Sequence, residues 1–246
     1  MMKTKDFDTL VAHLHDLQQK SELWNTPVCS GFLEEAEQMK IFPLFPESDG
    51  VHYFGGYEEA MKKKVIFLPM GEGGFSDVVC LKAKINQKFR KIGHKDVLGA
   101  LMALQVERSS FGDFWVEEGA VYLYTSEDMV SFFERYFTQV NQLRIHWERL
   151  ENYPVYKRAF QVFEVVVASN RLDAMVAALM KTSREKAKHQ IQAGQVFLNH
   201  EMIEEASKLC HNGTTISIRG CGRFQFMEMI RQTKSGRLVA SMKQYI

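Results

Sequence analysis

The chain has 246 residues, 46% of them hydrophobic, so it can form one large domain or two to three small ones with buried cores. No apolar run of about 18 residues occurs, and the charged first residues lack an apolar signal region, which argues against a membrane span or secretion and favours the cytoplasm. The net charge of +1 combines a net of −5 over residues 1–168 with a net of +6 over residues 169–246, and a basic region of this kind favours an acidic partner, most often nucleic acid.

The first segment, residues 1–74, is predicted to be a small α/β unit, and it is the acidic part of the chain. Apolar residues recur at helical spacing from Phe7 to Leu17, so we expect an amphipathic helix over residues 5–19. A short helix is expected at Tyr57–Lys63 and a strand at Val65–Leu68. Gly71–Gly74 is interpreted as a flexible joint, since no Gly-Lys-Ser/Thr follows it as a phosphate loop would require.

The middle segment, residues 75–168, is predicted to be an RRM-like (ferredoxin-like) domain, which makes the fold class α+β. Its elements in chain order are a strand at Val78–Ile85, a helix at Lys95–Leu104, a hairpin of Asp113–Val116 and Ala120–Tyr124 around Glu117-Glu118-Gly119, a helix from Ser126 to about Gln139, and strands at Arg144–Arg149 and Phe160–Ala168. The order β-α-β-β-α-β is that of a sheet with helices on one face.

Four aromatic residues of the middle segment could stack on RNA bases: Phe114, Trp115, Tyr122 and Tyr124. The segment lacks the aromatic RNA-stacking signature of RRM domains. Packing in the hydrophobic core is therefore the favoured role for most of these side chains.

The last segment, residues 169–246, is predicted to begin with two short helices. Asn170 can cap the first helix, and Asp173 lies in its first turn, where a negative charge is favourable. Thr182 and Glu185 match a capping box at the start of the second helix. Gly194 ends that helix, and alternating strands follow it.

The second helix carries the candidate site. Arg184 and Lys188 lie one turn apart, beside an apolar stripe of Ala187 and Ile191. A phosphate would turn the repulsion between these two charges into attraction, and the helix N-terminus adds N–H donors. We expect Arg184→Glu with Lys188→Glu to abolish RNA binding without unfolding the domain. The alternative is an ordinary solvated helix face.

Basic residues near this helix and on the following strands complete the candidate set. The predicted RNA-binding residues are Arg171, Lys181, Arg184, Lys186, Lys188, Arg219 and Arg223. For the last two, the alternative is an exposed strand face. The main contact is expected to be with phosphates and RNA shape, since A-form RNA hides its base edges in a narrow groove.

The segment after residue 169 resembles the RNA-binding domain named after ribosomal small-subunit protein four, the S-four domain. The matching elements are Arg171-Leu172-Asp173, Ser183–Ala187, Ile191–Val196, Leu198-Asn199 and Gly213–Arg219. Further stretches resemble the YlmH family of bacterial S-four proteins: Phe54–Glu58, Lys63–Val65, His94–Met102 and Gly220–Phe224. Phe32–Ala36 departs from that family, where a proline is expected after the first acidic residue.

The resemblance implies a cytoplasmic, non-catalytic RNA-binding protein of three small parts, the middle one RRM-like. It implies association with ribosomal RNA or tRNA on the ribosome, in particular the large subunit during ribosome-associated quality control. It also implies a link to cell division in Gram-positive bacteria.

Two other classes of function stay open. S-four domains accompany pseudouridine synthases and tyrosyl-tRNA synthetases, and Arg171-Leu172-Asp173 superficially resembles the catalytic Arg-Leu-Asp of the synthases. Here, however, the tripeptide opens the first helix of the module, and no catalytic domain of the usual size remains. The other class is an adaptor for the division machinery that binds a protein partner through residues 1–70. Deleting those residues would then remove that partner and leave RNA affinity.

The sequence predicts no catalytic residue, no cofactor and no metal site. Its four cysteines, at positions 29, 80, 210 and 221, are sparse and unevenly spaced, as expected of reduced thiols. A zinc site would need Cys210, His211 and Cys221 plus one more ligand, and no Cys-x-x-Cys pair is present. Buried thiols that behave as small hydrophobic groups are the favoured interpretation.

Overall fold

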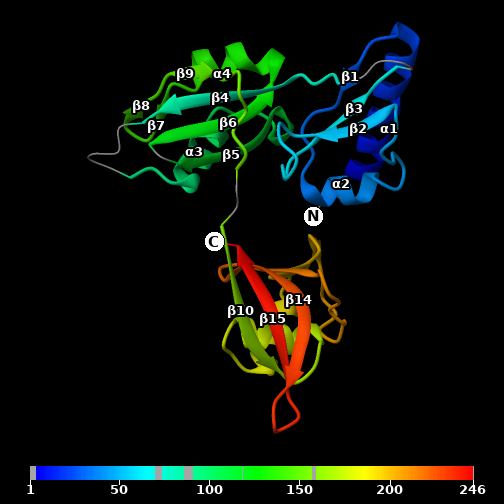
Figure 1. The fold of residues 1–246 in the computed structure, drawn as a ribbon, viewed down its shortest axis with the longest axis vertical. Helices are drawn as coiled ribbons and strands as arrows, with labels where there is room; N and C mark the ends of the chain where they lie inside the picture. Colours follow the sequence, from blue (N-terminus) through cyan, green and yellow to red (C-terminus); the bar gives the residue numbers. More distant parts are fainter. Residues whose placement is uncertain (1–3, 70–73, 86–90, 118, 157–158, 246) are drawn as a thin grey trace. The chain divides into compact units, whose positions relative to one another are not determined.

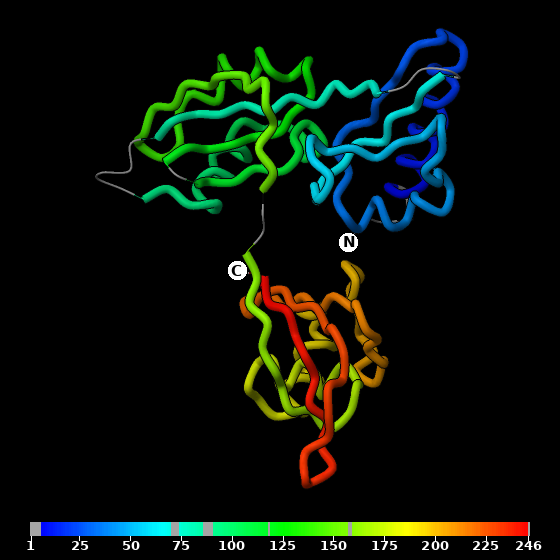
Figure 2. The backbone as a smooth tube through the Cα atoms, viewed as in Figure 1, coloured from blue at the N-terminus to red at the C-terminus, as the bar shows by residue number. Residues whose placement is uncertain are grey.

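The protein is an α+β chain with several antiparallel sheets (Figures 1 and 2). The computed structural model describes residues 4–69, 74–85, 91–117, 119–156 and 159–245. It divides into two compact units, the first ending at Tyr156 and the second following it. The predicted joint at Gly71–Gly74 lies almost wholly outside the described residues, as does Glu118 of the predicted hairpin. No helix of the described ranges is both long and apolar enough to cross a membrane.

The first unit begins with a long helix on a small sheet. Helix α1 (Thr4–Trp24) packs against a three-stranded antiparallel sheet of order β1-β3-β2, formed by Val28–Cys29, Lys64–Phe67 and Val51–Phe54, and α2 (Glu35–Ile41) follows β1 (Figure 1). The helix predicted over residues 5–19 is confirmed and extends further in both directions. Its last turn is tied to the sheet, because the buried Ser21 hydroxyl donates to the Phe67 carbonyl at 3.0 Å.

The short helix predicted at Tyr57–Lys63 is wrong, since this segment forms turns and bends. Gly56 has a φ of +103°, and an added Cβ would lie 2.2 Å from the Tyr124 ring. The chain must therefore approach the middle sheet closely, in a conformation that a helix does not allow. The neighbouring strand prediction at Val65–Leu68 is confirmed by β3.

The middle of the first unit is a four-stranded antiparallel sheet of order β5-β6-β4-β9. Its elements are β4 (Val78–Lys84), α3 (His94–Ala103), β5 (Phe111–Glu117), β6 (Ala120–Ser126), α4 (Val130–Tyr136) and β9 (Trp147–Arg149), with a small pair, β7 (Gln139–Val140) and β8 (Leu143–Arg144), before β9. The predicted hairpin is confirmed, because β5 pairs with β6. The second helix is shorter than predicted: a 3-10 turn at Glu127–Met129 leads into α4, which ends at Tyr136.

The last strand of this sheet differs from the prediction. The stretch Arg144–Arg149 divides between β8 and β9, and β9 pairs with β4, which completes the order β-α-β-β-α-β. The strand predicted at Phe160–Ala168 exists as β10 (Phe160–Val167), but it pairs with β15 in the second unit. Its assignment to the middle sheet is therefore wrong, because strand pairing between distant residues leaves no local signal in the sequence.

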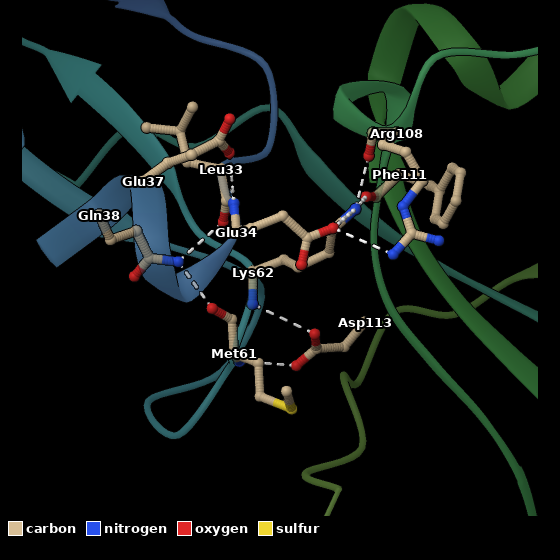
Figure 3. Close-up of polar contacts among 9 residues, drawn as sticks. All are labelled: Leu33, Glu34, Glu37, Gln38, Met61, Lys62, Arg108, Phe111 and Asp113. Carbon is tan, nitrogen blue, oxygen red and sulfur yellow. Dashed lines mark hydrogen bonds and ion pairs between the residues drawn. The ribbon is translucent and has the colours of Figure 1, made fainter. Parts of the chain in front are cut away.

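A buried polar network joins the N-terminal part to the middle sheet (Figure 3). The Lys62 ammonium donates to the carbonyls of Arg108 and Phe111, at 2.5 and 2.7 Å. The Asp113 carboxylate accepts from the Tyr57 hydroxyl and the Met61 N–H, both at 2.7 Å. Burial lowers the pKa of Lys62, although nearby Glu34 raises it. The turn at residues 57–63 is thus held by partners on β5 and not by helical hydrogen bonds.

The second unit is a six-stranded antiparallel sheet with two helices. The strand order is β10-β15-β14-β13-β11-β12, formed by Phe160–Val167, Leu238–Tyr245, Gly222–Gln232, Thr215–Ile218, Val196–Leu198 and Glu201–Met202. Helices α5 (Leu172–Leu179) and α6 (Arg184–Gln192) contribute to one hydrophobic core with the sheet. In Figure 1, strands β10, β15 and β14 lie in front of these yellow helices, and Figure 2 shows the β14–β15 loop extending from the sheet.

Candidate RNA interface

Helix α5 places a buried carboxylate at its N-terminus. Its apolar residues Leu172, Met175, Val176 and Leu179 recur at helical spacing and are buried. Asp173 lies in the first turn, as predicted, and its side chain is 0% exposed. The N-cap residue is Arg171, and not Asn170 as predicted, because the Asn170 amide donates to the Cys210 carbonyl at 3.4 Å.

Two arginines surround this carboxylate. The Arg184 Nη2 lies 2.9 and 2.8 Å from the two oxygens of Asp173, and the Arg171 Nε and Nη2 each lie 3.2 Å from one of them. Burial acts to raise the pKa of Asp173, but the hydrogen bonds and charges of Arg171 and Arg184 outweigh it and lower that pKa. Both arginine side chains stay partly exposed, Arg171 at 39% and Arg184 at 47%. The buried Asp173 therefore fixes two cations at the surface.

The N-cap of helix α6 lies one residue later than predicted. Ser183 is the N-cap residue, and its hydroxyl accepts the Lys186 N–H at 3.3 Å, so the prediction of Thr182 as the cap is wrong. The predicted end is confirmed, since α6 stops at Gln192 and Gly194 adopts a φ of +67°. The N-terminal end of α6 is thus set by a capping hydroxyl, and the C-terminal end by a glycine with a positive φ.

The basic residues of α6 lie on two sides of the helix. Ala187 and Ile191 are fully buried. Since successive helical residues rotate by about 100°, Arg184 and Lys188 flank this buried face, whereas Lys186 points away from it. Lys186 is exposed and Lys188 is partly buried. The exposed Lys181 precedes the helix with a φ of +51°.

The other two predicted site residues lie on the sheet and not on the helices. Arg219 follows β13, and its guanidinium lies 5.3 Å from the centre of the Phe197 ring. Arg223 is on β14, 5.4 Å from the Tyr245 ring and 3.1 Å from His200 Nε2. The seven predicted residues therefore form two groups: Arg171, Lys181, Arg184, Lys186 and Lys188 lie on or beside α5 and α6, and Arg219 and Arg223 lie on or beside the sheet.

Two basic residues near these groups were missed by the sequence reasoning. Lys208 is exposed and lies beside the start of α5, because Arg171 forms a β-bridge with Leu209 and the Leu172 N–H donates to the Lys208 carbonyl at 2.8 Å. Lys243 lies on β15, 3.8 Å from the Phe160 ring. Local sequence gave no signal for either, since both positions depend on contacts with distant residues.

The aromatic residues of the middle sheet serve mainly as core. Trp115 is 3% exposed and Tyr124 is 0% exposed. Trp115 stacks on Tyr156 at 5.1 Å, and the Tyr124 hydroxyl donates to the Pro154 carbonyl at 2.6 Å. The expected core role is confirmed for Trp115 and Tyr124, while Tyr122 and Phe114 are partly buried.

The Cys210 thiol of the second unit is fully buried. Burial raises the pKa of Cys210 to about 12. Among the described residues, no group of three or more histidine, cysteine, aspartate or glutamate side chains is arranged to hold a metal ion.

Two regions of the chain match known protein families. Residues 75–153 match a family described as "Putative RNA-binding domain in YlmH", and residues 170–216 match the S4 domain, which is the S-four domain named above. The five basic residues on and beside α5 and α6 all lie in the second region. The fold and these matches define a protein with an RNA-binding S4 domain.

The chain is also similar to one characterised protein and to one solved structure. The chain is 29% identical over 214 residues to the "Ribosome-associated protein quality control protein P2" of Bacillus subtilis (strain 168), covering 84% of this chain and 82% of that relative. Among solved structures it is similar to the "Cell division protein ylmH from Streptococcus pneumoniae", at 18% identity and a TM-score of 0.47, covering 61% of this chain and 93% of that one. The chain thus carries a region that matches the RNA-binding domain of YlmH, followed by a region that matches the S4 domain.

Proposed function

We propose that this protein is a non-catalytic, cytoplasmic RNA-binding protein that binds structured RNA, either ribosomal RNA or tRNA, on the ribosome. The observation that carries the proposal is the set of five basic residues on and beside α5 and α6 within the S4 region, two of which, Arg171 and Arg184, share the buried Asp173. Such a set attracts the RNA phosphates, and the backbone N–H groups at the start of α6 add donors for the same anion.

The name of the Bacillus subtilis relative supports the setting of this activity, because that protein is described as ribosome-associated and as part of protein quality control. We assign the same setting to this chain, with the large subunit as the binding partner. A role in cell division through a protein partner is the second candidate.

Each basic residue of this set has a distinct proposed role. Arg171 and Arg184 present guanidinium groups that Asp173 holds in place, so they can bind phosphate oxygens with little loss of side-chain entropy. Lys181, Lys186 and Lys188 supply point charges around them. Arg219 and Arg223 extend the basic surface along the sheet.

The proposed organisation has three parts: an N-terminal α/β segment up to residue 74, an RRM-like middle domain, and the S4-type domain. The topology of the middle sheet supports its RRM-like assignment, since β4, α3, β5, β6, α4 and β9 follow the β-α-β-β-α-β order. We move the last boundary from residue 168/169 to Tyr156, because β10 belongs to the C-terminal sheet.

Co-sedimentation with ribosomes tests the proposal. Wild-type protein is mixed with small subunits, large subunits and whole ribosomes over a salt series. We expect binding to the large subunit that falls steeply with salt, because bound lysines and arginines release counterions from RNA. Lys186→Glu with Lys188→Glu should weaken this binding and reduce the magnitude of its salt slope by about 2, which is one for each lost phosphate contact.

A charge-matched control separates this site from a general charge effect. Lys234→Glu with Arg237→Glu makes the same charge change in the exposed β14–β15 loop, far from α6 in the sequence. It should bind nearly as wild type. Equal losses in both double variants would contradict the assignment of the site, and absence of binding by wild type to any particle would contradict the function.

A further inference from the structure

The sheet of the second unit has one face that the two helices do not cover. The inner face contributes residues such as Phe226, Ala240 and Met242 to the core with α5 and α6. Side chains on a strand alternate between faces, and directly paired residues share a face. The residues that alternate with these three, and their partners on neighbouring strands, therefore lie on the outer face.

The outer face carries an aromatic and basic row across all six strands. In strand order from β10 to β12, the first row consists of Phe160, Tyr245, Arg223, Ser217, Phe197 and Met202. The second row, from β10 to β13, consists of Val162, Lys243, Gln225 and Thr215. None of these ten residues is acidic. With strands about 4.8 Å apart, the longer row spans about 24 Å.

Each of the three rings in this row has a cation beside it. The Lys243 ammonium lies 3.8 Å from the centre of Phe160 and 5.4 Å from that of Tyr245. The guanidinium groups of Arg223 and Arg219 lie 5.4 and 5.3 Å from the rings of Tyr245 and Phe197. The flexible cations can move from a ring to a phosphate while remaining within reach of both.

These side chains are accessible in the structure. Phe160 is 51% exposed, and Phe197 and Tyr245 are partly exposed. An open sheet face with cations beside exposed rings is an arrangement on which unpaired bases stack while their phosphates bind lysine and arginine. Phe160, Arg223, Lys243 and Tyr245 lie outside both regions that match known families.

We propose that this outer face binds an unpaired segment of RNA, with bases stacked on Phe160, Tyr245 and Phe197 and phosphates bound by Lys243, Arg223 and Arg219. The inference rests on the proposed RNA-binding function and adds a second surface to it. The α5–α6 turn binds the backbone of a structured region, and the sheet binds single-stranded nucleotides. Charge complementarity selects RNA as the occupant, since the row offers cations and no carboxylate.

Binding of two fluorescent RNAs to the full-length protein tests the inference. One probe is an oligouridine of about 12 nucleotides, which has no stable structure, and the other is a hairpin RNA. Phe160→Leu with Phe197→Leu keeps apolar side chains but removes two rings. We expect this variant to lose about 5- to 100-fold in affinity for oligouridine and to keep most of its affinity for the hairpin.

Controls make the outcomes separable. Val166→Ala changes another exposed apolar residue of β10 and should leave both affinities unchanged. Lys186→Glu with Lys188→Glu should weaken hairpin binding more than oligouridine binding. Thermal unfolding checks that each variant folds, and Phe160→Leu with Lys243→Gln replaces the first variant if Phe197→Leu does not fold.

Two results would overturn the inference. In the first, wild type binds the hairpin but not oligouridine, which leaves the proposed function in place. In the second, the ring variants bind oligouridine as wild type does, which indicates that the outer face serves another partner, such as a protein. Failure of wild type to bind either RNA or ribosomes would instead reject the proposed function itself.

Discussion

At the scale of single residues, the contacts of Asp173 decide which basic residues can be substituted without disturbing the fold. Its carboxylate is buried between Arg171 and Arg184. Arg184→Glu would place a second carboxylate against it, so the expectation that Arg184→Glu with Lys188→Glu leaves the domain folded no longer holds. Lys186 and Lys188 are the better targets, because Arg171 and Arg184 are the cations that hold Asp173.

Asp173→Asn should lower the free energy of unfolding at neutral pH by about 1–3 kcal/mol, since it weakens hydrogen bonds to two cations. The folded-state pKa of Asp173 is lowered, so its contribution is complete above the unfolded-state pKa of about 4 and is lost as the pH falls through the folded-state value. Urea unfolding from neutral to acidic pH measures both effects. Glu204→Gln, at an exposed position, is the control, and an equal acid dependence in wild type and Asp173→Asn would disagree with this account.

At the scale of elements, the start of α6 is set by a side chain that accepts a hydrogen bond from a backbone N–H of the first turn. Thr182 is the predicted cap, and the next residue, Ser183, also has a hydroxyl group that can accept an N–H. The structure selects Ser183, whose extended backbone allows its hydroxyl to reach the Lys186 N–H. The Thr182 N–H instead donates to the Ala177 carbonyl at 2.9 Å, in the turn that ends α5.

Ser183→Ala should therefore destabilise the second unit by about 1 kcal/mol, because it removes a cap, whereas Thr182→Ala should cost less. Chemical denaturation of the two variants, compared with wild type under the same conditions, gives the difference. A larger loss for Thr182→Ala would indicate that the capping box begins at Thr182 in solution.

At the scale of the whole molecule, the described residues 4–69 and the middle sheet form one folded unit. Phe32, Tyr57 and Ala60 share a buried cluster with Trp115 and Tyr124. Deletion of residues 1–70 would expose this cluster and remove Lys62 from its carbonyl partners. The deletion therefore does not separate an adaptor from an RNA binder, and point variants are needed instead.

Asp113→Ala should destabilise the first unit by about 2–3 kcal/mol, since the Tyr57 hydroxyl and the N–H groups of Met61 and Lys62 lose their acceptor. Figure 3 shows the contacts of Asp113 with Met61 and Lys62. Thermal unfolding of the full chain measures the shift. Glu58→Ala, at an exposed position of the same turn, is the control and should have little effect. Equal shifts in the two variants would show that the network contributes little to stability.

The sequence by itself determined the features that depend on near neighbours. Helical periodicity placed α1, α3, α5 and α6, alternation placed β11 and β13, and Gly194 marked the end of α6, because these signals act over a few residues. The excess of basic residues after residue 168 and the five cations on and beside α5 and α6 were also evident from the sequence.

Only the tertiary structure decided which distant residues meet. It paired β10 with β15, placed the buried Asp173 between Arg171 and Arg184, and replaced the expected helix at residues 57–63 by a turn held on Asp113. It also brought Phe160, Phe197 and Tyr245 into one row. Strand register and buried polar pairing are set by the packing of the whole unit, so no local pattern in the sequence specifies them.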